Sequence, residues 1–270
     1  MIIAVCGNSG AGKSTLALKL ARFLSNKKLN TVLIDTDFIT PQFNIWFPKK
    51  VLTHSSSLSV LLDNNIEIET VASKLQVEGE NLGVLGYDRD FSANAMPRRP
   101  DTSERLLTCL QSNELSDVVI VDVQTGFIND MLSFQAMSVA DIVIVALTPD
   151  VKGLSWFDAN IKMMDEGWSH VNKPVLKALS QVFPSSPVTE MEHILGKCDF
   201  YLPYSPEISE QMYTGEMAST SANSKSARKY LDVVRSIANV AADIRERKLQ
   251  EEENSTNYEY VMTDNKNKGV

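Results

Sequence analysis

The sequence has few cysteines, no excess of positive charge and no long apolar run, and each shortage excludes a class of protein. Its three cysteines, Cys6, Cys109 and Cys198, lie far apart and form no C-x-x-C pair, which argues against a thiolate-bound metal cluster within this chain. Buried reduced thiols are the simpler interpretation. The net charge of −8 argues against a surface that binds nucleic acid generally, so direct nucleic-acid binding is not indicated.

The hydropathy of the chain argues against a membrane-embedded protein. No apolar run reaches the roughly 20 residues that span a bilayer, and no basic segment precedes an apolar stretch at the N-terminus. A cytoplasmic location is the resulting expectation. The 270 residues are 43% hydrophobic and 22% charged, which is ordinary for a globular chain that buries one large core or two modest ones.

The first fifteen residues, MIIAVCGNSGAGKST, contain a phosphate-binding motif. Residues 7–14 fit G-x-x-x-x-G-K-[ST] without a mismatch. A short apolar run precedes the motif, as expected of a buried strand, and Leu16, Leu20, Phe23 and Leu24 follow it with the spacing of one helix face. The sequence therefore predicts a strand, a glycine loop and a helix. The nucleotide-binding residues predicted from this stretch are Gly7, Asn8, Ser9, Gly10, Ala11, Gly12, Lys13, Ser14 and Thr15.

The chemistry of this loop favours a nucleotide with Mg²⁺. Glycines let backbone N–H groups turn toward phosphate oxygens, and the helix N-terminus adds positive potential. Lys13 is expected to reach the terminal phosphates, and the Ser14 hydroxyl is expected to coordinate Mg²⁺.

The rest of the chain alternates between strand and helix patterns. Runs such as DVVIVDV and DIVIVALTP are rich in β-branched residues and are typical of strands covered on both faces. The predicted fold is α/β, with a doubly wound, mostly parallel sheet and helices on both faces, as in P-loop NTPases. Residues 1–249 are predicted to form one P-loop ATPase domain. Residues 250–270 are polar and patternless and are predicted to be a disordered tail.

Three acids end predicted strands at the edge where such sheets bind ligands. Asp35 and Asp37 end the second strand, and Asp122 ends the run VVIVD. A site for a nucleotide with Mg²⁺ needs an acid near the metal and a group that positions water. Asp122 begins a D-x-x-x-G segment, in which the Gly126 N–H can approach a γ-phosphate. Each acid also has the simpler interpretation of a carboxylate that caps a turn.

Five segments in order give the chain a resemblance to a known family. GNSGAGKST, VLIDTDFITPQF, VVIVDVQTG, ADIVIVALTPDVKGLSW and LPYSPEISEQMYTGE resemble the successive motifs of the ParA/MinD family of P-loop ATPases, over about residues 1–245. The similarity is greatest to the group that includes CpaE and TadZ, which help to localise pilus and secretion machinery. The resemblance implies that ATP and Mg²⁺ bind, that ATP drives formation of a homodimer, and that a protein partner of unknown identity recognises one nucleotide state.

The resemblance also assigns roles to residues. It implies that Lys13 and Ser14 fill the P-loop positions, that Asp37 orients the attacking water, and that Asp122 and Gly126 form the second switch. It further implies that Pro203 and Tyr204 pack near the adenine. The last helix is a poor match to the membrane anchor of MinD, so no autonomous membrane anchor is expected.

Asn8 departs from the family pattern. Most of the family has a lysine at this position, which reaches across the dimer to the phosphates of the partner, whereas atypical members, CpaE-like ones among them, depart from this pattern. A neutral amide carries no charge to stabilise phosphate, so slow hydrolysis and weak dimerisation are expected. Because the family side chain points out of the phosphate cradle, the loop is expected to tolerate Asn8→Lys. An arginine-bearing loop with Arg89, Arg98 and Arg99 either replaces the missing cation or is solvated surface.

The sequence leaves several functions open. The favoured function is an ATPase that positions or regulates a macromolecular assembly, in pilus or secretion systems, conjugative transfer or DNA partition. One alternative is a nucleotide-sensing scaffold that does not hydrolyse ATP, and a weaker one is a small-molecule P-loop kinase. Phe43, Trp46 and Phe47, just after the second strand, are either a partner-binding surface or core.

Overall fold

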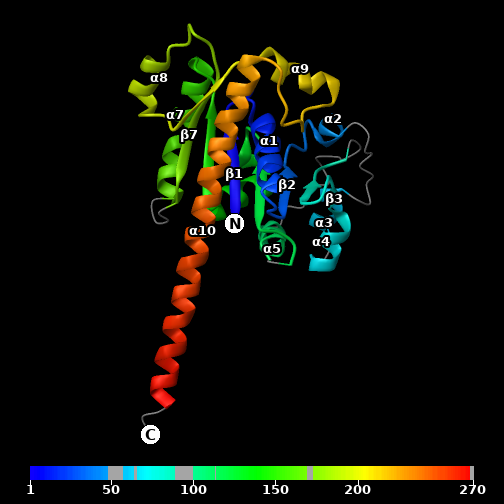
Figure 1. Ribbon diagram of the computed structural model, residues 1–270, viewed down its shortest axis with the longest axis vertical. Helices are drawn as coiled ribbons and strands as arrows, with labels where there is room; N and C mark the ends of the chain where they lie inside the picture. The colour runs from blue at the N-terminus through cyan, green and yellow to red at the C-terminus, as the bar shows by residue number, and fades with distance from the viewer. Residues whose placement is uncertain (48–56, 64–65, 89–99, 113, 169–172, 268–270) are drawn as a thin grey trace.

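The computed structural model describes residues 1–47, 57–63, 66–88, 100–112, 114–168 and 173–267. Within these residues an eight-stranded sheet has the order β3-β4-β2-β5-β1-β6-β7-β8. All neighbouring strands are parallel except β3 and β4. Helices cover both faces of the sheet (Figure 1). The predicted α/β fold with a mostly parallel sheet is confirmed.

The elements follow the predicted alternation of strand and helix. The strands are β1 (Ile2–Gly7), β2 (Thr31–Asp35), β3 (Gln76–Val77), β4 (Leu82–Leu85), β5 (Val118–Asp122), β6 (Ile142–Leu147), β7 (Val175–Val182) and β8 (Phe200–Pro203). The helices are α1 (Lys13–Asn26), α2 (Phe43–Trp46), α3 (Leu58–Asp63), α4 (Ile68–Lys74), α5 (Pro100–Leu110), α6 (Met131–Val139), α7 (Val151–Trp168), α8 (Val188–Leu195), α9 (Pro206–Thr214) and α10 (Lys225–Asn267), with a 3-10 turn η3 (Phe127–Asn129).

The four central strands are buried along their whole length, which explains their uninterrupted apolar runs. Their register places functional side chains together. Val5 lies opposite Asp122 in the β1–β5 pair, and Asp35 lies opposite Asp122 in the β2–β5 pair. Because the strands are parallel, the segments that follow β1, β2 and β5 meet at one edge of the sheet.

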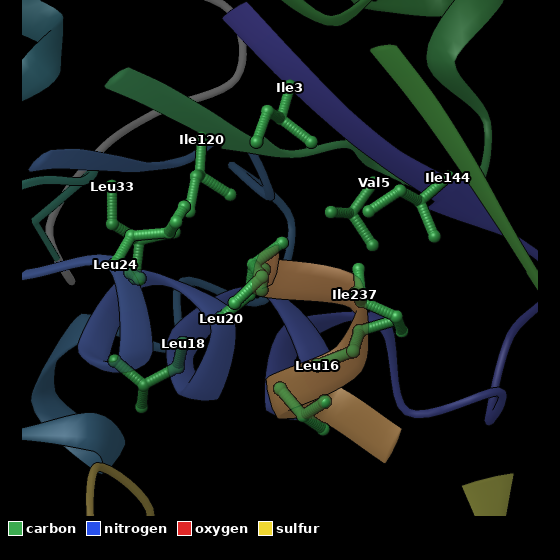
Figure 2. Close-up of a cluster of buried hydrophobic side chains, with 14 of the residues drawn as sticks. Ile3, Val5, Leu16, Leu18, Leu20, Leu24, Leu33, Ile120, Ile144 and Ile237 are labelled. Carbon is green, nitrogen blue, oxygen red and sulfur yellow. The ribbon is translucent and has the colours of Figure 1, made fainter. Parts of the chain in front are cut away.

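Two hydrophobic clusters hold the helices to the sheet. Alternate residues of β1 divide between them, so that Ile3 and Val5 face one side while Ile2 and Ala4 face the other. Figure 2 shows the first cluster, in which leucines of α1 and Ile237 of α10 gather beneath the strands. This packing fixes the P-loop helix against the centre of the sheet.

Two details were not settled by the sequence. The short strand β3 pairs antiparallel with β4 at the sheet edge, and its two residues are too few to show an alternating pattern. Phe43, Trp46 and Phe47 are buried in or beside α2, which decides for core packing and against a partner-binding surface at these side chains.

The C-terminal segment is helical in the structure. The helix α10 runs to Asn267, whereas residues 250–270 are predicted from the sequence to be disordered. Beyond Ala241, the helix still contacts the body through Ile244, Arg245 and Lys248, and Figure 1 shows its C-terminal end extending away from the body. A helix that packs against nothing is marginal in water. Disorder of this tail, and the boundary at residue 249, therefore stay predictions. No described helix has the length and apolar character needed to cross a membrane.

Removal of residues 251–270 tests this boundary. Because the C-terminal end of α10 extends away from the body, the truncated protein is expected to keep the Tm and the nucleotide affinity of the full chain. Differential scanning calorimetry and isothermal titration calorimetry measure both. A Tm lower by several degrees would show that the segment contributes to the folded state.

Candidate functional site

A cavity of about 370 Å³ lies at the carboxyl edge of the sheet. The loop between β1 and α1 forms one wall. The segments that follow β2 and β5, the end of β7, the segment from the end of β8 into α9, and one residue of α10 form the others. The lining residues are Ser9, Gly10, Gly12, Lys13, Ser14, Thr15, Asp37, Thr40, Gln42, Asp122, Val123, Gln124, Thr125, Ser180, Gln181, Pro203, Tyr204, Ser205, Ile208, Ser209, Met212 and Tyr230. Thus Lys13, Asp37 and Asp122, which are distant in sequence, share one cavity.

The glycine loop adopts a backbone conformation that residues with a side chain would not readily adopt. Gly10 and Gly12 have φ angles of 80° and 75°, in the left-handed region. At Gly7 the constraint is contact as well as conformation, since a Cβ there would lie 1.8 Å from the Ala146 carbonyl oxygen. Gly12 precedes α1 and has no side chain to cap it. The first N–H groups of α1 therefore remain available to an anion.

Lys13 is held by the wall of the cavity. Its Nζ donates to Thr125 Oγ1 at 2.8 Å and to the Asn8 carbonyl at 3.3 Å. Burial lowers the pKa of this ammonium, and the carboxylate of Asp122 opposes the shift. A phosphate group in the cavity would give this partly buried cation a further anionic partner.

Asp122 and Ser14 fit a magnesium site. Burial raises the pKa of Asp122 to about 6, against the opposing effects of a hydrogen bond from Ser14 and the charge of Lys13. Asp122 Oδ1 is buried and has no hydrogen-bond partner among the described residues. An unpartnered carboxylate oxygen beside a hydroxyl is the kind of oxygen pair that Mg²⁺ or its bound water accepts. These two residues would hold the ion.

Asp35 and Asp37 shape the loop after β2. Asp35 is fully buried and accepts hydrogen bonds from the N–H groups of Asp37 (3.0 Å) and Gln42 (2.7 Å). Burial, with the charge of Asp122 next in size, raises the pKa of Asp35 well above its usual range. Asp37 reaches the cavity and accepts from the Thr40 N–H at 2.9 Å and the Thr40 hydroxyl at 2.7 Å. Asp35 therefore stabilises the loop, and Asp37 lines the cavity.

Asn8 links the P-loop to the segment between β6 and α7. Its side chain is 3% exposed; Oδ1 accepts from the Thr148 N–H at 3.0 Å, and Nδ2 donates to Thr148 Oγ1 at 2.9 Å. The Thr148 hydroxyl in turn donates to Asp150 at 2.7 Å, and Asp150 accepts from the N–H groups of Lys152 and Gly153 at the start of α7. Asn8 lies outside the cavity lining, but it is buried rather than free. The expectation that the loop tolerates Asn8→Lys is therefore withdrawn, because that lysine would lose both bonds with Thr148.

The residues predicted to pack near adenine lie in the wall of the cavity. Pro203 and Tyr204 both line it, and the Tyr204 ring stacks on Phe183 with centroids 4.5 Å apart. Gln181 lies in the left-handed region with φ 58°, where β7 and β8 shift register, and its amide donates to the Gly10 carbonyl. This irregularity of β7 brings Ser180 and Gln181 into the cavity wall.

Some predicted residues lie elsewhere. Gly7, Asn8, Ala11 and Gly126 do not line the cavity; Gly7 and Ala11 shape the loop, and Gly126 precedes η3. Arg89, Arg98 and Arg99 lie outside the described residues. The question of a replacement cation in that loop therefore stays open as a prediction.

A buried lysine that the sequence analysis did not single out supports the cavity wall. Lys19 of α1 is fully buried, and its Nζ donates to Gln211 Oε1 at 2.7 Å and to the carbonyls of Met217 and Ser219 at 3.1 and 2.8 Å. These bonds tie the P-loop helix to α9 and to the segment after it. Lys19 lies between Leu18 and Leu20 in the sequence. The sequence pattern alone does not distinguish this buried lysine from an ordinary surface lysine.

Comparison with known proteins assigns the family. The family model of the CobQ/CobB/MinD/ParA nucleotide binding domain matches residues 2–254. The chain belongs to this family. No curated protein sequence matched the chain.

Solved structures of this family share the fold. A ParA family ATPase from Chlorobium tepidum superimposes with a TM-score of 0.72 at 16% identity, over 88% of this chain and 98% of that chain. The septum site-determining protein MinD complexed with Mg-ADP from Pyrococcus horikoshii gives 0.69 at 18% identity, over 90% and 98%. MinD in the MinC:MinD cell division protein complex from Aquifex aeolicus gives 0.67 at 15% identity, over 88% and 96%. At these identities the likeness shows the CobQ/CobB/MinD/ParA fold.

Replacement of Asn8 tests its structural contribution. Asn8→Ala leaves the Thr148 N–H buried without its acceptor, so the free energy of unfolding is expected to fall by about 1–3 kcal/mol. Urea denaturation measures this change. The control Asn26→Ala, on the exposed end of α1, is expected to stay within about 0.5 kcal/mol of the unmodified protein. Equal stability of both variants would contradict the buried linkage.

The pH dependence of stability tests the burial of Lys19. Burial lowers the pKa of Lys19 to about 8, from a usual 10.5. Between these values the unfolded chain keeps a proton that the folded chain releases, so this group makes folding more favourable as the pH rises through that window. Relative to Lys19→Met, the free energy of unfolding of the unmodified protein is expected to rise between pH 8 and pH 10. A difference that does not change with pH would contradict the lowered pKa.

Proposed function

We propose that this chain is a MinD/ParA-type ATPase in which ATP-dependent dimerisation and slow hydrolysis position or regulate a macromolecular assembly. The observation that carries the proposal is the joining of Lys13, Ser14, Asp37 and Asp122 in one cavity beside a glycine loop. The names of the similar solved proteins, which are ATPases and cell division proteins, support the same class of function.

The residues of this chain divide the work of binding. The N–H groups at the start of α1 bind phosphate oxygens, and Lys13 exchanges its bond with Thr125 for one with the terminal phosphates. Ser14 and Asp122 hold Mg²⁺, which when bound neutralises the charge that develops on the phosphates. Pro203 and Tyr204 contact adenine at the far end.

Asp37 is the proposed water-orienting residue. Its carboxylate faces the cavity, and its position follows from two bonds that Asp35 accepts within the same loop. To act on water it exchanges its contact with the Thr40 hydroxyl for one with the nucleophile. The reaction is attack of water on the γ-phosphorus of ATP, with ADP and phosphate as products.

Three exposed apolar side chains support dimerisation. Ile39, Ile128 and Val151 are 68%, 59% and 75% exposed. They follow β2, β5 and β6, so they lie at the same edge of the sheet as the cavity. Burial of these side chains between two copies would close the nucleotide sites. Because Asn8 carries no charge and is committed to Thr148, the dimer is proposed to be weak and hydrolysis slow.

A partner and a location complete the proposal. A similar MinD was solved in a MinC:MinD complex, which supports a protein partner that recognises one nucleotide state. The identity of that partner, and the choice among pilus or secretion assembly, conjugative transfer and DNA partition, are left to experiment. We keep the prediction of a cytoplasmic protein without an autonomous membrane anchor.

A nucleotide-sensing scaffold is the second candidate function. The buried, neutral Asn8 favours it, because a P-loop without the lysine that crosses the dimer still binds ATP but lacks one cation for hydrolysis. In this case ATP would bind without being hydrolysed, and the protein partner would distinguish only the ATP-bound from the empty protein.

Three variants test the residues of the proposed site. Lys13→Ala is expected to weaken ATP affinity at least about tenfold, because it removes the cation at the terminal phosphates. Asp37→Ala is expected to keep the affinity within about twofold and to abolish turnover. Lys27→Ala, exposed at the end of α1, serves as the control. Isothermal titration calorimetry, single-turnover hydrolysis and analytical ultracentrifugation with ATP measure the outcomes.

The unmodified protein decides between the candidates. Hydrolysis together with ATP-dependent dimers supports the ATPase. Tight binding with no hydrolysis supports the scaffold. Unchanged ATP affinity in Lys13→Ala would contradict the P-loop assignment.

A further inference from the structure

Tyr230 is the residue of α10 that lines the nucleotide cavity. Its side chain is 5% exposed and otherwise packs in the hydrophobic core. The hydroxyl has no hydrogen-bond partner among the described residues, yet its oxygen is not sealed from solvent. Because the rest of the side chain is enclosed by the core, this oxygen is reached from the cavity.

The packing of α10 places Tyr230 beside the end of β8. The helix packs against β8 and α9. Ser226, one helical turn before Tyr230 on the same face of α10, donates to Ser205 Oγ at 3.2 Å. Ser205 follows Tyr204 and immediately precedes α9, and both residues line the cavity with Pro203. Tyr230 therefore belongs to the wall in which adenine is proposed to bind.

The serine hydroxyls of this wall already make hydrogen bonds within it. Ser205 Oγ accepts from the Ile208 N–H at 3.4 Å, and Ser209 Oγ donates to the Ser205 carbonyl at 3.2 Å. The Tyr230 hydroxyl makes no such bond in the described part of the chain. A hydroxyl removed from water without a hydrogen bond destabilises the protein. In the wall of a ligand cavity, such a group indicates a partner that arrives with the ligand.

Charge argues against phosphate as that partner. Among the described residues that line the cavity, Lys13 is the one lysine or arginine, and it bonds to Thr125 after β5. The strands β1, β6 and β7 lie between β5 and β8 in the sheet. Phosphates are attracted to Lys13, so the uncharged nucleoside extends toward β8. Burial raises the pKa of Tyr230, so the phenol stays neutral and keeps its O–H as a donor.

We infer that Tyr230 is a specificity-determining residue, whose O–H donates a hydrogen bond to a ring nitrogen of adenine. This inference rests on the proposed binding of ATP. The ring nitrogens of adenine are neutral acceptors at the edge of a flat apolar ring. Pro203, Ile208 and Met212 supply apolar surface in the same wall, as base-binding cavities require. The contact adds α10 to the elements that bind the nucleotide.

The test compares Tyr230→Phe with the control Tyr213→Phe by isothermal titration calorimetry. Each change removes one hydroxyl oxygen, and Tyr213 on α9 is 89% exposed and lies outside the cavity lining. Four probes are titrated with Mg²⁺: ATP, 2′-deoxy-ATP, 3′-deoxy-ATP and inorganic triphosphate. Tyr230→Phe is expected to weaken the affinity for the three nucleotides by about three- to tenfold, as loss of one neutral hydrogen bond does. The affinity for inorganic triphosphate is expected to stay within about twofold, and Tyr213→Phe is expected to match the unmodified protein with every probe.

The thermal stability of Tyr230→Phe gives an independent measurement. Without nucleotide, its Tm is expected to equal or exceed that of the unmodified protein, because the change removes an unpaired hydroxyl. With Mg-ATP at one fixed concentration, its Tm is expected to rise less, because stabilisation by a ligand follows its affinity. Differential scanning calorimetry measures both values.

Three results would overturn the inference. Unchanged ATP affinity in Tyr230→Phe leaves no function for the hydroxyl in binding. An equal loss for ATP and inorganic triphosphate shows a general change of the cavity. A loss that disappears with either deoxy-nucleotide shows a contact with ribose instead of adenine. If the unmodified protein does not bind Mg-ATP, the proposed function fails together with this inference, and that result is seen before any variant is compared.

Discussion

The close contact between Gly7 and β6 is the constraint on which the site depends. The end of β1 approaches Ala146 so closely that no side chain fits, and the next residue, Asn8, bonds to Thr148 beyond the end of β6. The P-loop is thereby fixed to the centre of a buried sheet. Because β5 is the other neighbour of β1, the same arrangement brings Asp122 beside Lys13.

Electrostatics explain why this cavity suits an anion together with a metal ion. Asp35 and Asp122 are both buried, and burial raises the pKa of each. Their charged forms need compensation, which Lys13 supplies only in part because burial lowers its own pKa. A divalent cation beside Asp122 would supply further positive charge, and phosphates would pair with Lys13. Asp35 accepts hydrogen bonds from two N–H groups of the loop after β2, and these bonds hold Asp37 in place.

At position 8, an asparagine that makes a structural contact stands where most relatives are expected to have a charged lysine. A lysine that reaches another copy acts between molecules, whereas Asn8 acts within one chain, from the P-loop to the start of α7. Among the acidic side chains that line the cavity are Asp37 and Asp122 of the same chain. The helix α1 is held in turn by the buried Lys19, so the loop is supported from both ends.

The sequence by itself determined the P-loop, the parallel α/β fold and the strand-end acids Asp37 and Asp122, because glycine spacing, apolar periodicity and strand ends are local patterns. The sequence did not decide whether Trp46 lies in the core or on a partner-binding surface, and it did not predict the strand β3. The burial of Asn8 and the buried bonds of Lys19 were decided only by the tertiary structure. Asn8 bonds to a residue 140 positions away, and Lys19 to one 192 positions away. Such contacts depend on how the helices and loops pack around the sheet, which no local spacing encodes.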